Sequence, residues 1–296
     1  MRLASVKRPD STFSLHVEVE SEYVDVNSAA DQLSIAGLPA LSDVADLFRA
    51  GPAAVEKVRR VIGGAASRNV EGTPFDALHL APPVRRPASI VCIGRNYVEH
   101  IKEGNVPVPE YPILFAKFPN TLQAPGDGVR AHADLTDQLD YEGELCVVIS
   151  QRAHRVTADA ALDYVGGYTV LNDVSARDLQ YKDLQWIRGK SLDTWCPLGP
   201  VLVTSDEIPD PSALRIETRV NGELRQNASC SDMLFKVPEL IEFITAGITL
   251  EPGDLIATGT PSGVGLGFDP PRWLSVGDEI DVTIEPIGTL RSKVVD

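Results

Sequence analysis

Short segments rich in β-branched residues recur from residue 88 onward, and they constrain the fold more than any other feature of this sequence. Gly, Pro, Asn or Asp separates them, which is the pattern of β-strands joined by turns. The Asn221-Gly222 pair predicts a two-residue β-hairpin turn. A mainly β domain with a few helices is therefore expected. The segments are ASIVCIG (88–94), LCVVIS (145–150), GGYTVLND (166–173), GPVLVTS (199–205), LRIETRVNGE (214–223), LIATG (255–259) and EIDVTIEPIG (279–288).

Helical patterns in this region are fewer. They are DAALDY (159–164), SARDLQYKDLQ (175–185) and VPELIEFITAG (237–247), the last with Gly247 as its C-cap.

The first 86 residues show a different pattern. Two possible strands, SLHVEVE (14–20) and EYVDVN (22–27), precede LSDVADLFRAGPAAVEKVRRVI (41–62), where apolar residues fall at helical spacing and Ser42 is a candidate N-cap. The proline-rich LAPPVRRPAS then interrupts regular structure and reads as a linker. We predict two domains, a small α+β domain at 1–86 and a larger domain at 87–296. The fold class is α+β, predominantly β.

Composition and charge limit the partners. The chain has 296 residues, 43% of them hydrophobic and 23% charged, which is typical of a globular protein. It has no apolar run of about 20 residues, so no membrane span is expected, and its start lacks the apolar core of a secretory signal. Four scattered cysteines without a CxxC pair indicate reduced thiols and a cytoplasmic protein.

The net charge of −15 argues against nucleic acid as a partner. If the substrate is an anion, the same charge would repel it, and a bound divalent cation would supply the local positive centre that is needed.

Several familiar motifs are incomplete. The Gly189-Lys190-Ser191 triplet lacks the earlier glycine of a phosphate loop, because position 184 is leucine. The glycine-rich TGTPSGVGLG (258–267) does not contain G-x-G-x-x-G. There is no G-x-S-x-G or HExxH, and five single histidines do not suggest a zinc site. Nucleotide binding, zinc hydrolysis and serine hydrolysis of the G-x-S-x-G type are thereby disfavoured.

Two glutamates in LDYEGELCVVIS (139–150) are the first candidates for a site. Glu142 and Glu144 are two residues apart, so on a strand both side chains point to the same face. Their repulsion becomes attraction when a divalent ion lies between them, and carboxylate oxygens without His or Cys suit Mg²⁺ or Mn²⁺. Asp173, in YTVLND, is a further candidate. The alternative is that the two glutamates line a solvated strand face.

A second constellation lies in GRNYVEHIKEGN (94–105). His100 and Glu103 are neighbours if the segment is helical, and a carboxylate that orients an imidazole makes a base able to activate water. The glycine and prolines that follow suggest a mobile lid. The alternative is an ordinary surface contact.

Lys190 is a third candidate, since it precedes a segment expected to be buried. A buried lysine needs an anionic partner, and a substrate carboxylate or oxyanion would serve.

Taken together, the chain resembles the fumarylacetoacetate hydrolase family over about residues 88–288. The order and spacing of the matching stretches are more specific than any one of them. They are IVCIGRNYVEH, PILFAKFPNT, DYEGELCVVI, VGGYTVLNDVSARDLQ, QWIRGKSLDTWCPLGP, VNGE and ITLEPGDLIATGTPSGVG. The resemblance implies a mixed β-roll or barrel-like catalytic domain, a homodimer, and a small N-terminal domain like that of longer members.

The resemblance also implies roles for single residues. A divalent cation, Mg²⁺ or Mn²⁺, would be held by a carboxylate triad, and a His-Glu pair would activate water under a lid. A lysine and a glutamine would contact substrate oxygens, and two further residues would line the pocket. On this sequence they are Glu142, Glu144 and Asp173 for the metal, His100 and Glu103 for the pair, Lys190 and Gln180 for the oxygens, and Thr260 and Arg95 for the pocket.

The activity implied is hydrolysis of a carbon–carbon bond in a 2,4-diketo acid such as an acylpyruvate, through an enolate that the metal stabilises. Oxaloacetate decarboxylation, isomerisation of a dienoic keto acid and a ureidoglycolate lyase reaction remain alternatives on the same metal site, because a shared fold does not select the reaction. A metal-stabilised binding protein without catalysis is the alternative from a different class.

Overall fold

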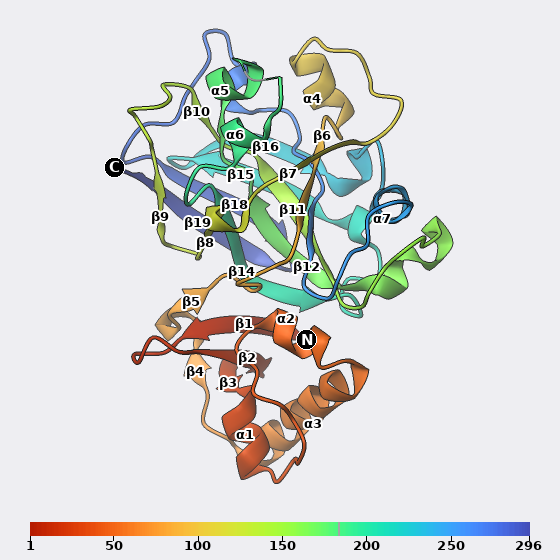
Figure 1. The fold of residues 1–296 in the computed structure, drawn as a ribbon. Helices are drawn as coiled ribbons and strands as arrows, with labels where there is room; N and C mark the ends of the chain where they lie inside the picture. Colours follow the sequence, from red (N-terminus) through yellow and green to blue (C-terminus); the bar gives the residue numbers. More distant parts are fainter. Residues whose placement is uncertain (183) are drawn as a thin grey trace.

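Antiparallel strands and helices α1 to α3 form the N-terminal region of the computed structural model, which describes residues 1–182 and 184–296. Strand β1 pairs with β2 and β5, and β2 continues through β3 to β4. In Figure 1 this region, coloured red to orange, lies at one end of the molecule. Its elements are β1 (Arg2–Lys7), β2 (Phe13–Val19), β3 (Glu22–Asp25), α1 (Val26–Gln32), α2 (Val44–Arg49), α3 (Pro52–Arg68), β4 (Thr73–Pro74) and β5 (Leu80–Ala81).

The first strand connects this region to the rest of the chain, which the sequence pattern did not predict. Strand β1 pairs antiparallel with β14 (Cys196–Thr204), Arg2 opposite Val203 and Leu3 opposite Leu202. Four consecutive residues of β1 are buried, so it lacks the alternation that marks a half-buried strand. The domain division at residue 86 stays a prediction, because a sheet that spans both regions neither requires nor forbids independent folding.

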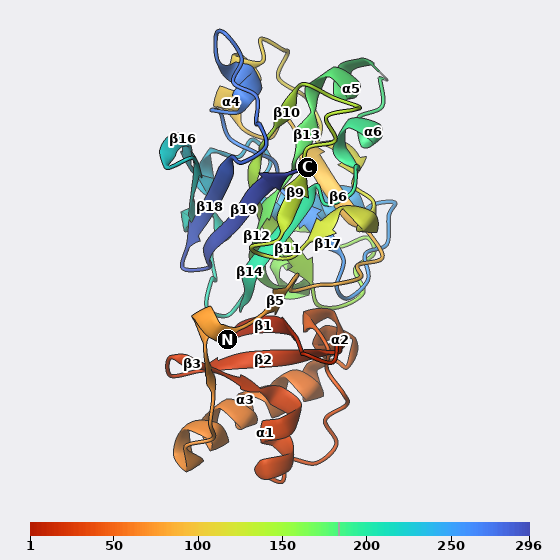
Figure 2. The same cartoon turned by 90° about the vertical axis from the view of Figure 1, so that its left-hand side faces the viewer.

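Two large sheets pack against each other, and the short strands β10 (Leu139–Asp140) and β13 (Ser175–Ala176) pair as a separate two-stranded sheet. Among the described residues, twelve strands make one mixed sheet, in the order β4-β3-β2-β1-β14-β12-β11-β17-β6-β7 with β5 and β8 at its side, and five make a second, in the order β16-β15-β18-β19-β9. Strands β15 and β19 of the second sheet contact β11 and β14 of the first, and residues of both sheets share one hydrophobic core. Figure 2 shows β18 and β19 lying across β11, β12 and β14. This is the predominantly β architecture that was predicted.

Strands β6, β11, β12, β14, β15, β17 and β18 lie on the seven predicted segments, and β16 is the second strand of the predicted hairpin; β7, β8, β9, β10, β13 and β19 were not predicted. The strands are β6 (Ile90–Gly94), β7 (Ile113–Ala116), β8 (Leu122–Gln123), β9 (Gly128–Arg130), β10 (Leu139–Asp140), β11 (Gly143–Ile149), β12 (Val165–Asn172), β13 (Ser175–Ala176), β14 (Cys196–Thr204), β15 (Arg215–Val220), β16 (Glu223–Ser229), β17 (Leu255–Ala257), β18 (Glu279–Glu285) and β19 (Gly288–Val295). The helices are α4 (Val98–Glu103), α5 (Arg177–Lys182), α6 (Ile187–Lys190) and α7 (Val237–Thr245).

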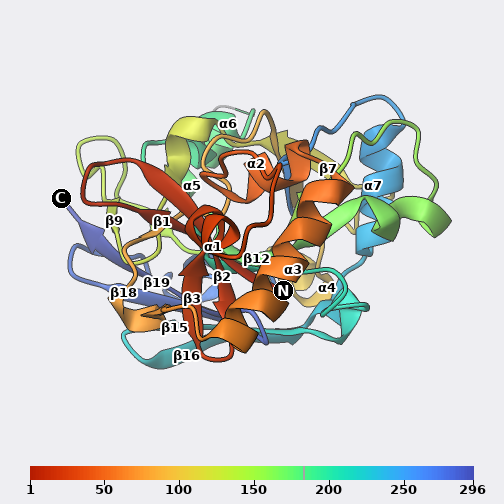
Figure 3. The ribbon, with the colours of Figure 1, turned by 90° about the horizontal axis from the view of Figure 1, so that it is seen from below.

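The predicted helix over residues 41–62 is two helices. Helix α2 ends at Arg49 and α3 begins at Pro52. Proline disrupts a helix when it lies in the interior, but it is well tolerated in the first turn, so Pro52 ends the first helix and starts the second. The cap is Asp43, whose side chain accepts the N–H of Asp46, and not Ser42. Seen from below in Figure 3, α3 crosses the N-terminal strands.

Other local predictions need smaller corrections. The segment 175–185 begins as the short strand β13 before α5, and residue 183 lies outside the described residues. The segment DAALDY belongs to a 3₁₀-helix, Ala158–Tyr164. Helix α7 ends at Thr245 with Ala246 as its cap, before Gly247. The hairpin is confirmed: β15 and β16 pair around Asn221 and Gly222, whose φ angles of 52° and 79° suit a tight hairpin turn.

The cysteines agree with the prediction of unpaired thiols, since Cys92, Cys146, Cys196 and Cys230 are all free and buried. None of the helices in the described part of the chain has the length and apolar composition that crossing a membrane requires.

Candidate active site

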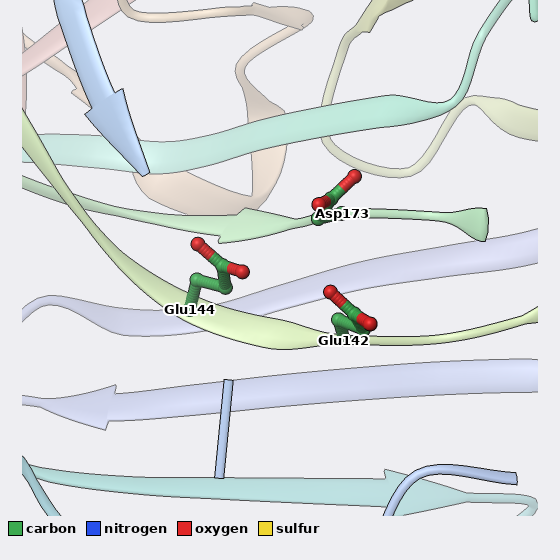
Figure 4. A group of neighbouring side chains, drawn as sticks. All are labelled: Glu142, Glu144 and Asp173. Carbon is green, nitrogen blue, oxygen red and sulfur yellow. The ribbon is translucent and has the colours of Figure 1, made fainter. Parts of the chain in front are cut away.

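Three carboxylates converge where β11 and β12 lie side by side. Glu142 precedes β11 and Glu144 lies within it, while Asp173 directly follows β12. The strands pair antiparallel, and the N–H of Asp173 donates to the carbonyl of Glu142 at 2.8 Å. One ligand oxygen from each side chain lies within 4.8 Å of the other two, and all three residues are buried. Figure 4 shows the two glutamates rising from one strand toward Asp173. The predicted convergence is confirmed.

Two buried lysines neutralise part of this charge. The Lys190 ammonium lies 2.8 Å from Glu142 Oε2 and 2.8 Å from Asp173 Oδ2. The Lys117 ammonium lies 2.6 Å from Asp173 Oδ1 and also donates to the carbonyl of Val174 at 3.2 Å. Burial alone would lower the pKa of Lys190, but Asp173 and Glu142 outweigh it and raise that pKa, which keeps the ammonium charged. Lys190 is buried as predicted, but its anionic partners are the protein carboxylates Glu142 and Asp173, where a substrate carboxylate or oxyanion was expected.

An arginine completes the ion-pair network. Arg177, at the start of α5, places Nη1 2.7 Å from Glu142 Oε1 and Nε 2.8 Å from Asp140 Oδ2. Its Nη1 also donates to the side-chain oxygen of Gln180 at 3.0 Å. Burial favours the neutral guanidinium, but Glu142 and Asp140 outweigh it and raise the pKa of Arg177. Glu142 is thus held between two cations.

The two glutamates differ in their electrostatic environment. Burial opposes ionisation of Glu142, but Lys190 and Arg177 overcome it and lower the pKa of that carboxyl. Burial, followed by Asp173 and Glu142, raises the pKa of Glu144 well above its usual range. The carboxylate of Glu144 accepts the N–H of Gly259 at 2.8 Å, which is a neutral donor. Glu144 therefore still requires a positive charge or a proton.

The donor set fits a hard divalent cation. Its candidate ligands are all carboxylate oxygens, as Mg²⁺ and Mn²⁺ prefer. Around them, four carboxylates (Asp140, Glu142, Glu144, Asp173) face three cations (Lys117, Arg177, Lys190) in the described part of the chain. A divalent ion would change this excess of one negative charge into an excess of one positive charge, which suits an anionic substrate.

The histidine and glutamate of the predicted lid contact each other. Helix α4 places His100 Nδ1 3.0 Å from Glu103 Oε2, and both side chains are 16% exposed. The other carboxylate oxygen of Glu103 accepts the N–H of Gly263 at 2.9 Å. With Nδ1 bound to the carboxylate, Nε2 is the nitrogen left to accept a proton.

One pocket joins the lid to the carboxylate cluster. Both His100 and Glu103 line it together with Glu142, whereas Glu144 and Asp173, which neighbour Glu142, are not among its lining residues. The other predicted residues all line it as well: Arg95, Gln180, Lys190 and Thr260. The structure therefore places seven of the nine predicted residues around one cavity, with His100 and Glu103 on α4.

The neighbours of three of these residues constrain their roles. The Gln180 oxygen is occupied by Arg177. Thr260 donates to the carbonyl of Gly143 at 2.9 Å and accepts from Gln226 at 2.8 Å, so its hydroxyl supports the pocket wall. Arg95 has a left-handed backbone with φ of 55°, and its guanidinium lies 5.6 Å from the Trp186 ring.

Sequence patterns alone missed Lys117, Arg177 and Asp140. Lys117 had a visible signal, since it follows the apolar strand β7 directly, where a charged residue needs a partner if it is buried. Arg177 and Asp140 had none, because their importance comes from a contact between segments 37 residues apart.

Comparisons with known proteins agree with this site. Residues 89–295 match the family model described as fumarylacetoacetate (FAA) hydrolase, C-terminal. The chain belongs to the fumarylacetoacetate hydrolase family, and it is an enzyme of that family with a buried carboxylate metal site.

Two relatives are named for one activity. Oxaloacetate tautomerase YisK of Bacillus subtilis is 54% identical over 218 residues, 73% of this chain and 72% of the relative. The mitochondrial oxaloacetate tautomerase FAHD2B of Bos taurus is 42% identical over 252 residues, 84% of this chain and 79% of the relative.

Solved structures match over the whole chain. A fumarylacetoacetate hydrolase from Exiguobacterium antarcticum has a TM-score of 0.80 at 38% identity, covering 100% of this chain and 99% of that one. A maleylpyruvate hydrolase from Sphingobium sp. SYK-6, in complex with manganese(II) and pyruvate, has a TM-score of 0.79 at 29% identity, covering 100% and 99%.

Proposed function

We propose that this enzyme interconverts the keto and enol forms of a four-carbon 2-keto dicarboxylate, oxaloacetate. The observation that carries the proposal is the His100–Glu103 pair, 3.0 Å apart, which lines the same pocket as the cation-rich carboxylate cluster. The names of the two relatives support the choice of substrate. This replaces carbon–carbon hydrolysis, which the sequence suggested first, as the leading candidate.

The chemistry requires one proton to leave C3 and one proton to reach the oxygen on C2. Glu103 holds the His100 ring with its proton on Nδ1, so Nε2 has a free lone pair to take the C3 proton. The carboxylate then stabilises the imidazolium until it returns its proton to the substrate. A Mg²⁺ or Mn²⁺ ion held by Glu142, Glu144 and Asp173 would neutralise the negative charge that develops on the substrate oxygens.

The pocket residues hold the dianionic substrate. Lys190 and Arg177 keep the pocket floor positive once a divalent ion is bound, and Arg95 adds a further cation at the wall. Ionised donors bind carboxylates strongly when both are removed from water. Leu266, Val264 and Phe115 supply apolar lining that limits water around the reacting carbon.

The test is the rate at which the enol absorbance of freshly dissolved oxaloacetate decays with Mg²⁺ or Mn²⁺ and enzyme. His100→Gln is expected to lower kcat by about 10²–10⁴-fold, the usual contribution of a general acid–base group. Glu99→Gln is the matched control, since Glu99 lies on the same helix but, among the residues that the structure describes, forms an ion pair only with exposed Lys102. If the enol absorbance decays no faster with the wild-type enzyme and metal than with the metal in buffer alone, the proposal is refuted.

Hydrolysis of a 2,4-diketo acid is the second candidate. The same His100–Glu103 pair could activate water, and the similarity to a maleylpyruvate hydrolase favours it. The products separate the reactions: tautomerisation releases none, hydrolysis of an acylpyruvate releases pyruvate and an acid, and oxaloacetate decarboxylation releases CO₂. A homodimer also remains part of the proposal, and light scattering of the purified enzyme tests it.

A further inference from the structure

The glycine-rich segment Thr258–Gly267, which matched no nucleotide motif, holds acidic side chains of the active site through its backbone. The N–H of Gly259 donates to Glu144 at 2.8 Å and the N–H of Gly263 donates to Glu103 at 2.9 Å. The N–H of Gly265 donates to Asp140 at 2.6 Å. One segment therefore contacts a metal-site carboxylate, the partner of His100 and the partner of Arg177.

Within this segment, Gly267 lies against the side chain of Glu103. A Cβ atom built on Gly267 would lie 2.0 Å from Glu103 Oε1, 2.2 Å from Cδ and 2.5 Å from Cγ. Real Cβ atoms do not approach other atoms so closely, so any side chain here must displace something. All three atoms belong to a flexible side chain, and Gly267 does not have a left-handed φ. An added methyl group would therefore move Glu103 and spare the backbone.

The other glycines of the segment cannot be used to move the Glu103 side chain without also disturbing the backbone. Gly263 has a φ of 100°, and a Cβ there would lie 1.9 Å from the carbonyl oxygen of Arg225. A side chain at Gly263 would distort the segment itself. Gly267 is thus the position where the space around Glu103 can be changed without rebuilding its surroundings.

We propose that Gly267 is a positioning residue for this enzyme. Its lack of a side chain leaves the space in which the Glu103 carboxylate bridges the N–H of Gly263 and Nδ1 of His100, and this bridge holds helix α4 closed over the pocket. The inference rests on the proposed function, in which His100 accepts the substrate proton. The glycine-rich segment thereby anchors helix α4 to the pocket through Glu103.

Gly267→Ala is the test variant, and Gly247→Ala is the matched control because a Cβ at Gly247 meets nothing within 4 Å. Since a misplacement of about 1 Å at a reacting group can cost about 10²-fold in rate, Gly267→Ala is expected to lower kcat by about 10–100-fold. The KM for oxaloacetate, the metal affinity and the melting temperature should match those of the control. A wild-type kcat in Gly267→Ala would overturn the inference.

A double-mutant cycle separates positioning from general damage. Glu103→Ala removes the atoms that the new methyl group would strike, so adding Gly267→Ala to it should cost no further activity. If Gly267→Ala lowers kcat by the same factor in both backgrounds, it acts independently of Glu103 and the inference is wrong.

A substrate-free readout keeps this test distinct from that of the proposed function. Nitrogen NMR of histidine-labelled enzyme, with His100 assigned from the His100→Gln spectrum, reports which ring nitrogen carries the proton. Wild type and Gly247→Ala should show the proton on Nδ1, and Gly267→Ala should lose that preference. If the NMR result is as expected but the wild-type enzyme does not turn over oxaloacetate, the proposed function is wrong and the positioning role of Gly267 stands. An unchanged His100 signal in Gly267→Ala would overturn the positioning role, whatever the substrate is.

Discussion

Lys117 provides the sharpest test of the charge balance in the metal centre. Its ammonium is 0% exposed, lies 2.6 Å from Asp173 Oδ1 and also donates to the carbonyls of Val174 and Lys190. Lys117→Met keeps much of the side-chain volume and removes the charge. Asp173, which is also 0% exposed, would then keep only Lys190 as an ion-pair partner among the described residues.

Removal of one partner from a buried ion pair usually costs about 3–5 kcal/mol in the free energy of unfolding. Because Lys190 remains 2.8 Å from Asp173, we expect the free energy of unfolding to fall by about 3 kcal/mol, the lower end of that range, when metal is removed with a chelator. A divalent ion supplies the missing charge, so it should bind Lys117→Met more tightly than wild type. At 100 times its Kd, the ion adds about 2.7 kcal/mol to the free energy of unfolding.

The assay is urea unfolding with chelator and with Mg²⁺ in excess. Lys293→Met is the control, because Lys293 is 55% exposed and its pair with Glu279, 3.3 Å apart, is worth about 0–1 kcal/mol at most. Two results would refute the reasoning: equal stability of the two variants in chelator, or a Mg²⁺ effect on Lys117→Met smaller than that on wild type.

Three further predictions concern other parts of the molecule. Glu144→Gln should retain the metal-free stability, because the pKa of the Glu144 carboxyl is raised by burial and by its acidic neighbours, and it should abolish the increase in melting temperature with Mg²⁺. Burial lowers the pKa of His16, although Asp25 partly opposes this effect, so the unfolded chain binds more protons at this residue than the folded chain does. The free energy of unfolding should therefore fall as the pH drops below about 6.5, and His16→Gln should reduce that fall when urea unfolding is measured across this pH range. Leu3→Ala, at a fully buried position of β1, should lower the free energy of unfolding by about 2–5 kcal/mol, measured by urea unfolding, and a surface-like change below about 0.5 kcal/mol would contradict the packing of β1.

Some features of the active site were predictable because they depend only on local backbone geometry. Glu142 and Glu144 share a face because side chains alternate along a strand. His100 and Glu103 meet because residues three apart are neighbours on a helix. The order of these motifs along the chain also indicated the family, and with it the candidate positions Gln180, Thr260 and Arg95.

Other features follow from how distant segments cross, and neither spacing nor composition contains that information. Lys117 reaches Asp173 across 56 residues, and the N–H of Gly263 reaches Glu103 across 160. Strand and helix periodicities act within a few residues, so they were enough to predict the mainly β character, the paired glutamates and the histidine–glutamate pair. The cations that neutralise the carboxylates, the pairing of β1 with β14 and the close approach of Gly267 to Glu103 became visible only in the folded chain, because strand register and close packing bring those groups together from distant parts of the sequence.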